Sequence, residues 1–269
     1  MLKLRILTAL ILIPLVILGI FYLPRPFFVL ISILIFSLAA WEWARLSGWS
    51  TVWLKLLYVA LIIAGMIGSN FIPQGGIFAI IIGAFWWLLV FAWVLKERKA
   101  AKLMRLPQWS ILLSGFLVLL PCWHAILFLQ HEPALLFYML LMIWICDSAA
   151  YFGGRLWGKT KLAVSISPNK TFEGLYTAIV STVLLSALAC WFIFTPHDLQ
   201  LSWLLPVLPL IVSVVIGDLF ESALKRIGNL KDSGGLLPGH GGILDRIDSL
   251  TAAAPVFTCA VIFLRQSGY

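Results

Sequence analysis

Charged residues are scarce in this chain. Asp, Glu, Lys and Arg make up only 11% of its 269 residues, whereas soluble domains carry roughly 25%. With 62% hydrophobic residues and a mean hydropathy of +1.04, the sequence lacks the polar side chains that a water-facing surface requires. A soluble globular protein is therefore excluded, and the sequence predicts a membrane protein.

Paired cysteines and a cleavable leader are also missing. The four cysteines lie far apart inside apolar segments and form no CxxC pair, so we interpret them as core residues. The N-terminus has basic residues and an apolar run to Leu23, but no small-residue cleavage site follows before a second apolar stretch. The first run is therefore predicted to be a membrane span rather than a signal peptide.

Long apolar runs, by contrast, are abundant. A helix needs about 20 apolar residues to cross a bilayer, and about nine stretches come close to this length. Every span is expected to be helical, because lipid cannot satisfy open backbone groups. The spans are predicted at 6–23, 27–41, 53–72, 77–95, 109–129, 134–152, 173–194, 202–220 and 250–265.

The basic residues orient these spans. With nine spans and a cytoplasmic N-terminus, only Arg25 and Arg265 of the 19 Lys and Arg residues fall outside, and the C-terminus lies outside too. The predicted fold is an all-α polytopic transmembrane helix bundle. Residues 1–133 would hold about five spans, and residues 134–269 a catalytic region with two cytoplasmic glycine-rich loops. Positive charge placed in such loops suits membrane lipid rather than nucleic acid.

Two predicted inner segments, 147–174 and 217–249, are dense in charge and glycine and hold most of the eleven carboxylates. Three other carboxylates, Glu42, Glu97 and Glu132, lie at loop or span ends and are expected to be solvated. The chemistry is therefore predicted to lie in the two inner segments.

The first segment is predicted to form a glycine-rich turn. It carries Arg155, Lys159 and Lys170, whose side chains suit phosphate oxygens. The letters from Gly153 to Thr160 match GxxxxGK[ST], but they follow a predicted transmembrane helix rather than a strand. We therefore discard a Walker loop and keep the phosphate-binding turn.

The second segment begins with a polar helix face. Asp218, Glu221, Ser222 and Lys225 recur at i, i+3, i+4 and i+7 where the eighth predicted span leaves the membrane. Carboxylates at such a place are unfavourable unless they are paired, solvated or bound to metal, so a functional site is the first hypothesis. A simple salt bridge between Glu221 and Lys225 is the alternative.

A loop at 231–242, with five glycines and a proline, then leads into the last span. A loop of this kind lets the backbone approach a ligand closely, although a flexible linker is the alternative. Asp245 and Asp248 stand at i and i+3 at the start of a helix and can point at one centre, which Asp218 could approach from the neighbouring helix. Oxygen ligands favour Mg²⁺ or Mn²⁺ over zinc, for which His240 is the only imidazole nearby. Complementing the helix dipole is the alternative role of these two aspartates.

Residues 222–226, 231–232, 237–242 and 245–248 read SALKR, KD, LPGHGG and DRID. Residues 167–174 read SPNKTFEG, and Asp147 is followed by YFGG at 151–154. These three parts of the sequence resemble the signature of phosphatidate cytidylyltransferases. The resemblance extends over residues 140–252, and Asn169 stands where that family often has a second lysine.

The resemblance implies that a phosphate oxygen of phosphatidic acid attacks the α-phosphorus of CTP, with Mg²⁺ required and pyrophosphate released. A site at the inner ends of the sixth to ninth predicted spans would meet both substrates at the cytoplasmic face of the cell inner membrane. Such a transfer depends on positioning and charge neutralisation. We expect Asp218, Asp245 and Asp248 to hold the metal. The expected catalytic residues are Asp218, Lys225, Asp245, Asp248 and His240, and the expected substrate-binding residues are Ser222, Arg226, Lys231, Asp232, Arg246, Lys170, Asp147, Arg155 and Lys159.

Other functions remain open from the sequence. A CTP-dependent polyprenol kinase would share membrane spans and nucleotide. A transporter is disfavoured because the polar groups gather on one side of the membrane. A CDP-alcohol phosphotransferase is disfavoured because no DG-x-x-A-R run is present. The sequence also leaves open whether the chain forms a homodimer.

Overall fold

The structure is a computed structural model that describes residues 2–96, 107–193, 204–236 and 241–266. Within these ranges the chain forms nine α-helices, one short 3-10 helix and one pair of strands. The helices are α1 (Leu2–Tyr22), α2 (Arg25–Leu46), α3 (Val52–Gly68), η1 (Ser69–Phe71), α4 (Gly75–Lys96), α6 (Gln108–Leu129), α7 (Pro133–Trp157), α8 (Phe172–Ile193), α9 (Val207–Ile227) and α10 (Leu244–Gln266).

Eight of the described helices, all except α1, are long and apolar enough to cross a membrane, and α1 contributes a shorter apolar stretch, Leu10–Tyr22. These helices coincide with the predicted spans, so the prediction of a multi-pass helical membrane protein is confirmed. Several helices are longer than predicted, and α10 begins at Leu244 rather than residue 250. α2 reaches Leu46 rather than residue 41, and α7 reaches Trp157 rather than residue 152.

The longer α7 corrects one prediction, because Gly153 and Gly154 lie inside this helix rather than in a phosphate-binding turn. The physical reason is close packing of α7 against α8. A Cβ on Gly153 would collide with the Thr177 side chain of α8, and a Cβ on Gly174 would lie 2.6 Å from the carbonyl oxygen of Ala150. These glycines therefore bring two helices together rather than bend the chain.

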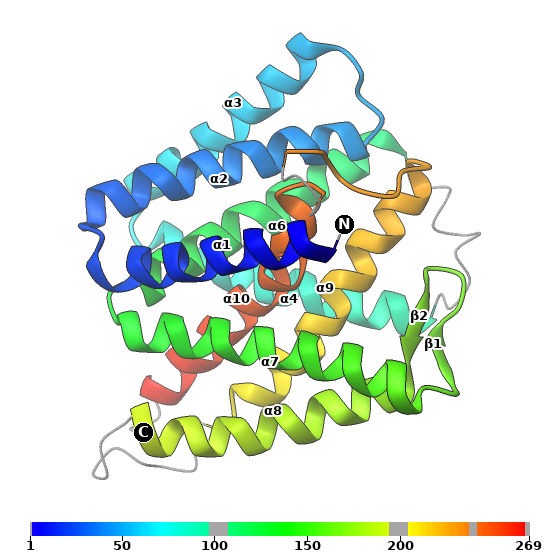
Figure 1. Cartoon of the computed structure of the whole chain (residues 1–269). Helices are drawn as coiled ribbons and strands as arrows, with labels where there is room; N and C mark the ends of the chain where they lie inside the picture. The colour runs from blue at the N-terminus through cyan, green and yellow to red at the C-terminus, as the bar shows by residue number, and fades with distance from the viewer. Residues whose placement is uncertain (1, 97–106, 194–203, 237–240, 267–269) are drawn as a thin grey trace.

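The helices with the largest buried share, α6, α9 and α10, lie at the centre of the bundle (Figure 1). α9 and α10 pack along each other, and α10 also contacts α4, α6, α7 and α2. The flanking helices α3 and α8 expose many large apolar side chains, which suits a surface in contact with lipid. One buried apolar cluster extends from Ile20 to Val261, so helices from both predicted regions share it.

A small antiparallel hairpin between α7 and α8 is an exception to the all-α prediction. Its strands are β1 (Lys161–Ala163) and β2 (Ser167–Thr171), and Lys161 pairs with Thr171. Ala163 and Ile166 pack against Leu219 and Ala223 of α9. The hairpin is thereby held on α9, and its second strand carries Lys170 to the polar face of that helix.

Candidate functional site

The site forms where the end of α9 approaches the beginning of α10. Gly217 makes this approach close, since a Cβ there would lie 2.6 Å from the carbonyl oxygen of Asp248 and 3.0 Å from the Cβ of Ala252. The next residue, Asp218, therefore stands beside the first turns of α10. The predicted meeting of these two helices is confirmed.

The first polar group, here called the Lys170 cluster, consists of Asp147, Lys170, Asp218 and Asp248. Lys170 of β2 forms an ion pair with Asp218 of α9. Asp147 of α7 and Asp248 of α10 lie within electrostatic range of both. Segments that are far apart in the sequence, the hairpin and three helices, thus converge at one point.

Lys170 is held in its charged form. Burial alone lowers the pKa of its ammonium group, but attraction to Asp218, together with their hydrogen bond and the charges of Asp147 and Asp248, raises the pKa above its ordinary value. Lys170 therefore remains a cation at neutral pH.

The Lys170 cluster has more carboxylates than cations, because three aspartates surround one lysine. Hydrogen bonds from neutral groups compensate part of this negative charge, and the shortest is donated by the backbone N–H of Ser249 to Asp248 Oδ1 at 2.7 Å. Ser222 Oγ donates to Asp218 Oδ1 over 3.2 Å, and Ser249 Oγ donates to Asp147 over 3.4 Å. Arg246 adds a further attraction to Asp147. The cluster is therefore suited to binding a further cation.

Among the described residues, no group of three or more His, Cys, Asp or Glu side chains is placed to hold a metal ion. This finding does not conflict with a magnesium site, because Mg²⁺ commonly binds through one or two carboxylates and completes its shell with water and substrate phosphates. The chemistry of the Lys170 cluster fits such an ion.

The second polar group, here called the Lys225 network, consists of Glu42, Glu221, Lys225, Ser233 and Asp245. Lys225 Nζ lies 2.6 Å from Glu221 Oε2 on its own helix and 2.8 Å from Asp245 Oδ1 on α10. The salt bridge that the sequence offered as an alternative is thus present, and it extends to a second carboxylate. Lys225 ties the end of α9 to the start of α10.

Asp245 accepts hydrogen bonds on its other oxygen as well. Asp245 Oδ2 receives the backbone N–H of Ser233 at 2.9 Å and that of Gly242 at 2.8 Å, and Ser233 Oγ lies 3.0 Å away. Its carboxylate is therefore fully engaged by Lys225 and by the loop between α9 and α10.

The structure separates the three aspartates predicted to share a metal. Asp218 and Asp248 belong to the Lys170 cluster, whereas Asp245 belongs to the Lys225 network. Six further predicted residues are exposed around these groups and include cations suited to phosphate. They are Arg155, Lys159, Arg226, Lys231, Asp232 and Arg246. His240 lies outside the described residues.

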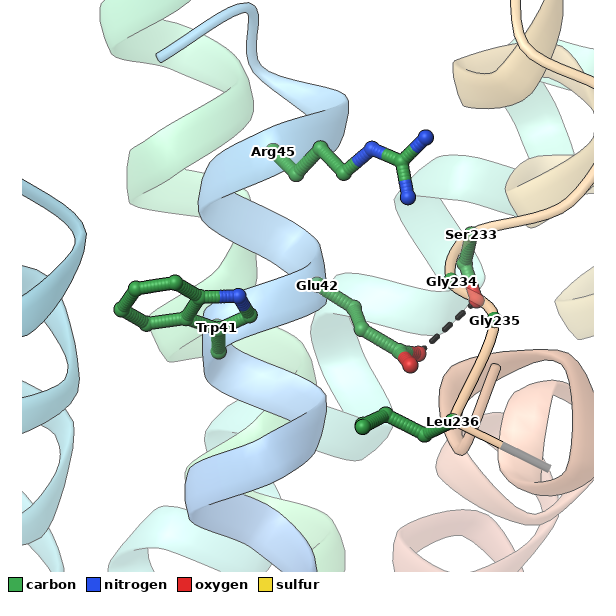
Figure 2. A pocket seen from close by; sticks show the side chains of 7 residues that line it. All are labelled: Trp41, Glu42, Arg45, Ser233, Gly234, Gly235 and Leu236. Atoms are coloured by element: carbon green, nitrogen blue, oxygen red, sulfur yellow. Dashed lines mark hydrogen bonds between the residues drawn. The ribbon is translucent and has the colours of Figure 1, made fainter. Parts of the chain in front are cut away.

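Glu42 differs from its predicted environment. It was expected to be solvated at the end of a span, but its side chain is only 2% exposed. It lies in α2 and points toward the loop of Ser233, Gly234 and Gly235 (Figure 2). The sequence does contain a signal for this burial. Glu42 is the single carboxylate in the tryptophan-rich run WEWARL, and a charge among apolar residues requires a partner.

Residues 3–264 match the profile of the cytidylyltransferase family. The chain is 39% identical over 260 residues to a phosphatidate cytidylyltransferase of Pseudomonas aeruginosa, with 96% of both chains covered. It is 32% identical to one of Haemophilus influenzae, over 98% of this chain and 100% of the relative. A relative of the same name from Brucella suis is 46% identical over 119 residues, which are 44% of this chain and 43% of the relative.

Proposed function

This chain belongs to the cytidylyltransferase family, and on that premise we propose that it is a phosphatidate cytidylyltransferase, which makes CDP-diacylglycerol and pyrophosphate from CTP and phosphatidic acid. The observation that carries this proposal is the similarity over 96% of both chains to the enzyme of that name from Pseudomonas aeruginosa. The polar groups at the ends of α9 and α10 provide the charges that such a reaction needs.

In this reaction a phosphate oxygen of phosphatidic acid forms a bond to the α-phosphorus of CTP, and the bond from that phosphorus to the β-phosphate oxygen breaks. Pyrophosphate leaves with the bonding electrons. The enzyme must hold two negatively charged substrates together, so its main tasks are positioning and charge neutralisation. Lys170 provides a permanent cation for this purpose.

We propose Mg²⁺, with Mn²⁺ as a substitute, as the metal of this site. Asp218 and Asp248 of the Lys170 cluster would hold it, and Asp147 would contribute charge or bind substrate. Asp245 remains in the proposed set, although it would have to release Lys225 to offer Oδ1 to a metal. When bound, the ion would neutralise phosphate charge during transfer.

The remaining proposed roles concern the phosphates of the substrates. Arg226 and Arg246 are exposed at the ends of α9 and α10, and with Lys170 they would contact triphosphate or phosphatidate oxygens. Lys225, which lies between Glu221 and Asp245, would also contact phosphate oxygens of the substrates. Ser222, Lys231 and Asp232, together with Arg155 and Lys159 beside the hairpin, would line the approach of the substrates, and His240 would stand near the leaving pyrophosphate.

We further propose that the protein lies in the cell inner membrane, with its N-terminus and active site at the cytoplasmic face and its C-terminus outside. The distribution of Lys and Arg supports this orientation. Phosphatidic acid would present its head group in the inner leaflet while CTP arrives from the cytosol. A homodimer remains compatible with this arrangement.

The test is pyrophosphate release by the purified protein in detergent with CTP, phosphatidic acid and Mg²⁺, each omitted in turn. Release that requires all three, together with formation of CDP-diacylglycerol, is expected. Formation of CDP with a polyprenol acceptor would instead identify a polyprenol kinase. Absence of CTP binding by folded protein would contradict both enzymatic functions and favour a transporter.

A further inference from the structure

Glu42 joins the N-terminal helices to the loop between α9 and α10. Its side chain extends from α2 beside a cavity of about 200 Å³, which is also lined by Trp41, Arg45 and the loop residues 233–236 (Figure 2). Nearly all of its surface is covered. A carboxylate buried to this degree requires several strong hydrogen bonds.

The loop and α10 provide these hydrogen bonds. Glu42 Oε1 accepts the backbone N–H of Ile243 at 3.0 Å, and Oε2 accepts that of Leu244 at 2.8 Å. Ser233 Oγ donates to Oε2 at 2.8 Å. The two backbone groups belong to the start of α10, where N–H groups have no partner within the helix. Glu42 therefore caps α10 from a distant helix.

The same contacts connect Glu42 to the Lys225 network. Ser233 Oγ lies between Glu42 Oε2 and Asp245 Oδ2 and shares its single proton with both carboxylates. Asp245 in turn binds Lys225. A change in the position of Glu42 thus acts on Asp245 through one hydroxyl group.

The glycine-rich loop is shaped around this carboxylate. A Cβ on either Gly234 or Gly242 would collide with the carboxylate oxygens of Glu42. The side chain occupies the space that larger residues in the loop would need. Glu42 and the loop residues Ser233, Gly234 and Gly242 therefore pack closely together, and we call this contact the joint. Its position is determined by α2.

We propose that Glu42 is a positioning residue of the enzyme: it fixes residues 233–236, residues 241–243 and the first turn of α10 so that Asp245 and Lys225 are held in place for nucleotidyl transfer. This inference rests on the proposed function. It also assigns a task to α2, whose sequence lies outside the run that resembles the family signature. Glu42 does not itself contact the reacting atoms.

The test compares Glu42→Gln and Ser233→Ala with the wild type. The Gln amide cannot accept from both Ile243 and Leu244, because one of these N–H groups would face the amide NH₂. We expect kcat of Glu42→Gln to fall about 10²-fold, as for other small displacements of catalytic groups. KM for phosphatidic acid should change less than about threefold, since a positioning defect acts mainly on the chemical step. Ser233→Ala should lower kcat about tenfold through loss of the hydroxyl group that donates to both Glu42 and Asp245.

A second readout is independent of activity. Lys231 is exposed in the loop, so trypsin cleavage after Lys231, followed by the mass of the fragments, reports how firmly the loop is held. Cleavage in Glu42→Gln should accelerate about tenfold, because local opening becomes easier. The double variant Glu42→Gln/Ser233→Ala should be no slower in turnover than Glu42→Gln, within about threefold, because both changes break the same connection.

Glu132→Gln is the matched control. Glu132 is an exposed carboxylate paired with Arg265 at the other end of α10, and its change should leave kcat and cleavage after Lys231 unaltered. A folded Glu42→Gln protein with wild-type kcat or cleavage rate would overturn the proposal. A loss of activity that only follows the loss of folded protein would also overturn it. If Glu42→Gln does not fold, wild-type kcat and cleavage in Ser233→Ala overturn it instead.

The two proposals fail separately. A wild-type protein that makes no CDP-diacylglycerol would contradict the proposed function, and the role of Glu42 in catalysis would fall with it. A wild-type enzyme that is active, with an equally active Glu42→Gln variant, would leave the function intact and remove only the positioning role.

Discussion

The two polar groups at the ends of α9 and α10 each gather three carboxylates around one lysine, but they differ in how those carboxylates are hydrogen-bonded. In the Lys225 network, Asp245 and Glu42 receive hydrogen bonds from backbone N–H groups, Ser233 and Lys225 at 2.8 to 3.0 Å. In the Lys170 cluster, Asp218 and Asp147 accept hydroxyl hydrogen bonds of 3.2 and 3.4 Å, and Asp248 accepts the backbone N–H of Ser249 at 2.7 Å. Asp245 and Glu42 are each held by several groups, which fits the proposed positioning role, whereas the Lys170 cluster fits the proposed binding of a cation and phosphates.

The largest expected effect is that of Asp218→Asn. This change removes one charge from the Lys170 cluster and leaves Lys170 without its ion-pair partner. If Asp218 holds the metal, turnover should fall by about 10³-fold or more, which corresponds to several kcal/mol of lost charge stabilisation. Formation of CDP-diacylglycerol across a Mg²⁺ titration measures this. Activity within severalfold of the wild type would mean that the cluster is not the metal site.

Lys225→Met tests the Lys225 network as a joint. Because Glu221 and Asp245 would lose their shared cation inside the protein, the free energy of unfolding should fall by about 3 kcal/mol. Denaturant or thermal unfolding in detergent measures the change. A matched double variant, Lys225→Met/Glu221→Gln, should recover part of the loss, since it leaves one fewer unpaired carboxylate. An unchanged unfolding transition in the single variant would contradict the structural role.

Lys170→Met tests the charge of the Lys170 cluster through pH. The pKa of Lys170 is raised by its aspartates in the folded protein, so its ion pair stabilises the fold below its unfolded pKa of about 10.4, as long as the aspartates are ionised. The difference in unfolding free energy between wild type and Lys170→Met, about 1 kcal/mol for a partly exposed pair, should be constant from about pH 8 to 9. It should disappear as pH rises through the folded pKa. A difference that is already lost between about pH 8 and 9 would contradict this assignment.

The smallest expected effect is that of Ser222→Ala. Ser222 Oγ donates to Asp218 over 3.2 Å, a long hydrogen bond on the partly exposed face of α9. Its loss should change turnover by less than about threefold. Ser233→Ala, which removes a hydroxyl from the Lys225 network, should have the larger effect on turnover. A reversed order would indicate that the Lys170 cluster, rather than the joint, depends on its hydroxyl contacts.

Residues with local patterns were predicted well. The helix face of Asp218, Ser222 and Lys225 follows from the spacing of one helix, and the salt bridge of Lys225 to Glu221 is an i, i+4 pair. The pairing of Lys170 with Asp218 could not be predicted, because it depends on a hairpin whose short strands carry no clear alternation. The solvated state expected for Glu42 was wrong, because its partners lie about 190 to 200 residues further along the chain.

The sequence by itself determined the helical type and approximate position of the membrane spans, because an apolar run of bilayer length can satisfy its backbone only as a helix. It also singled out the charged residues of α9 and α10 as candidates for the site. Only the tertiary structure decided how they divide into the Lys170 cluster and the Lys225 network. Close helix contact at Gly217, docking of the hairpin on α9 and the reach of Glu42 from α2 are all contacts between distant segments. Packing, rather than local pattern, therefore places each charge beside its partner.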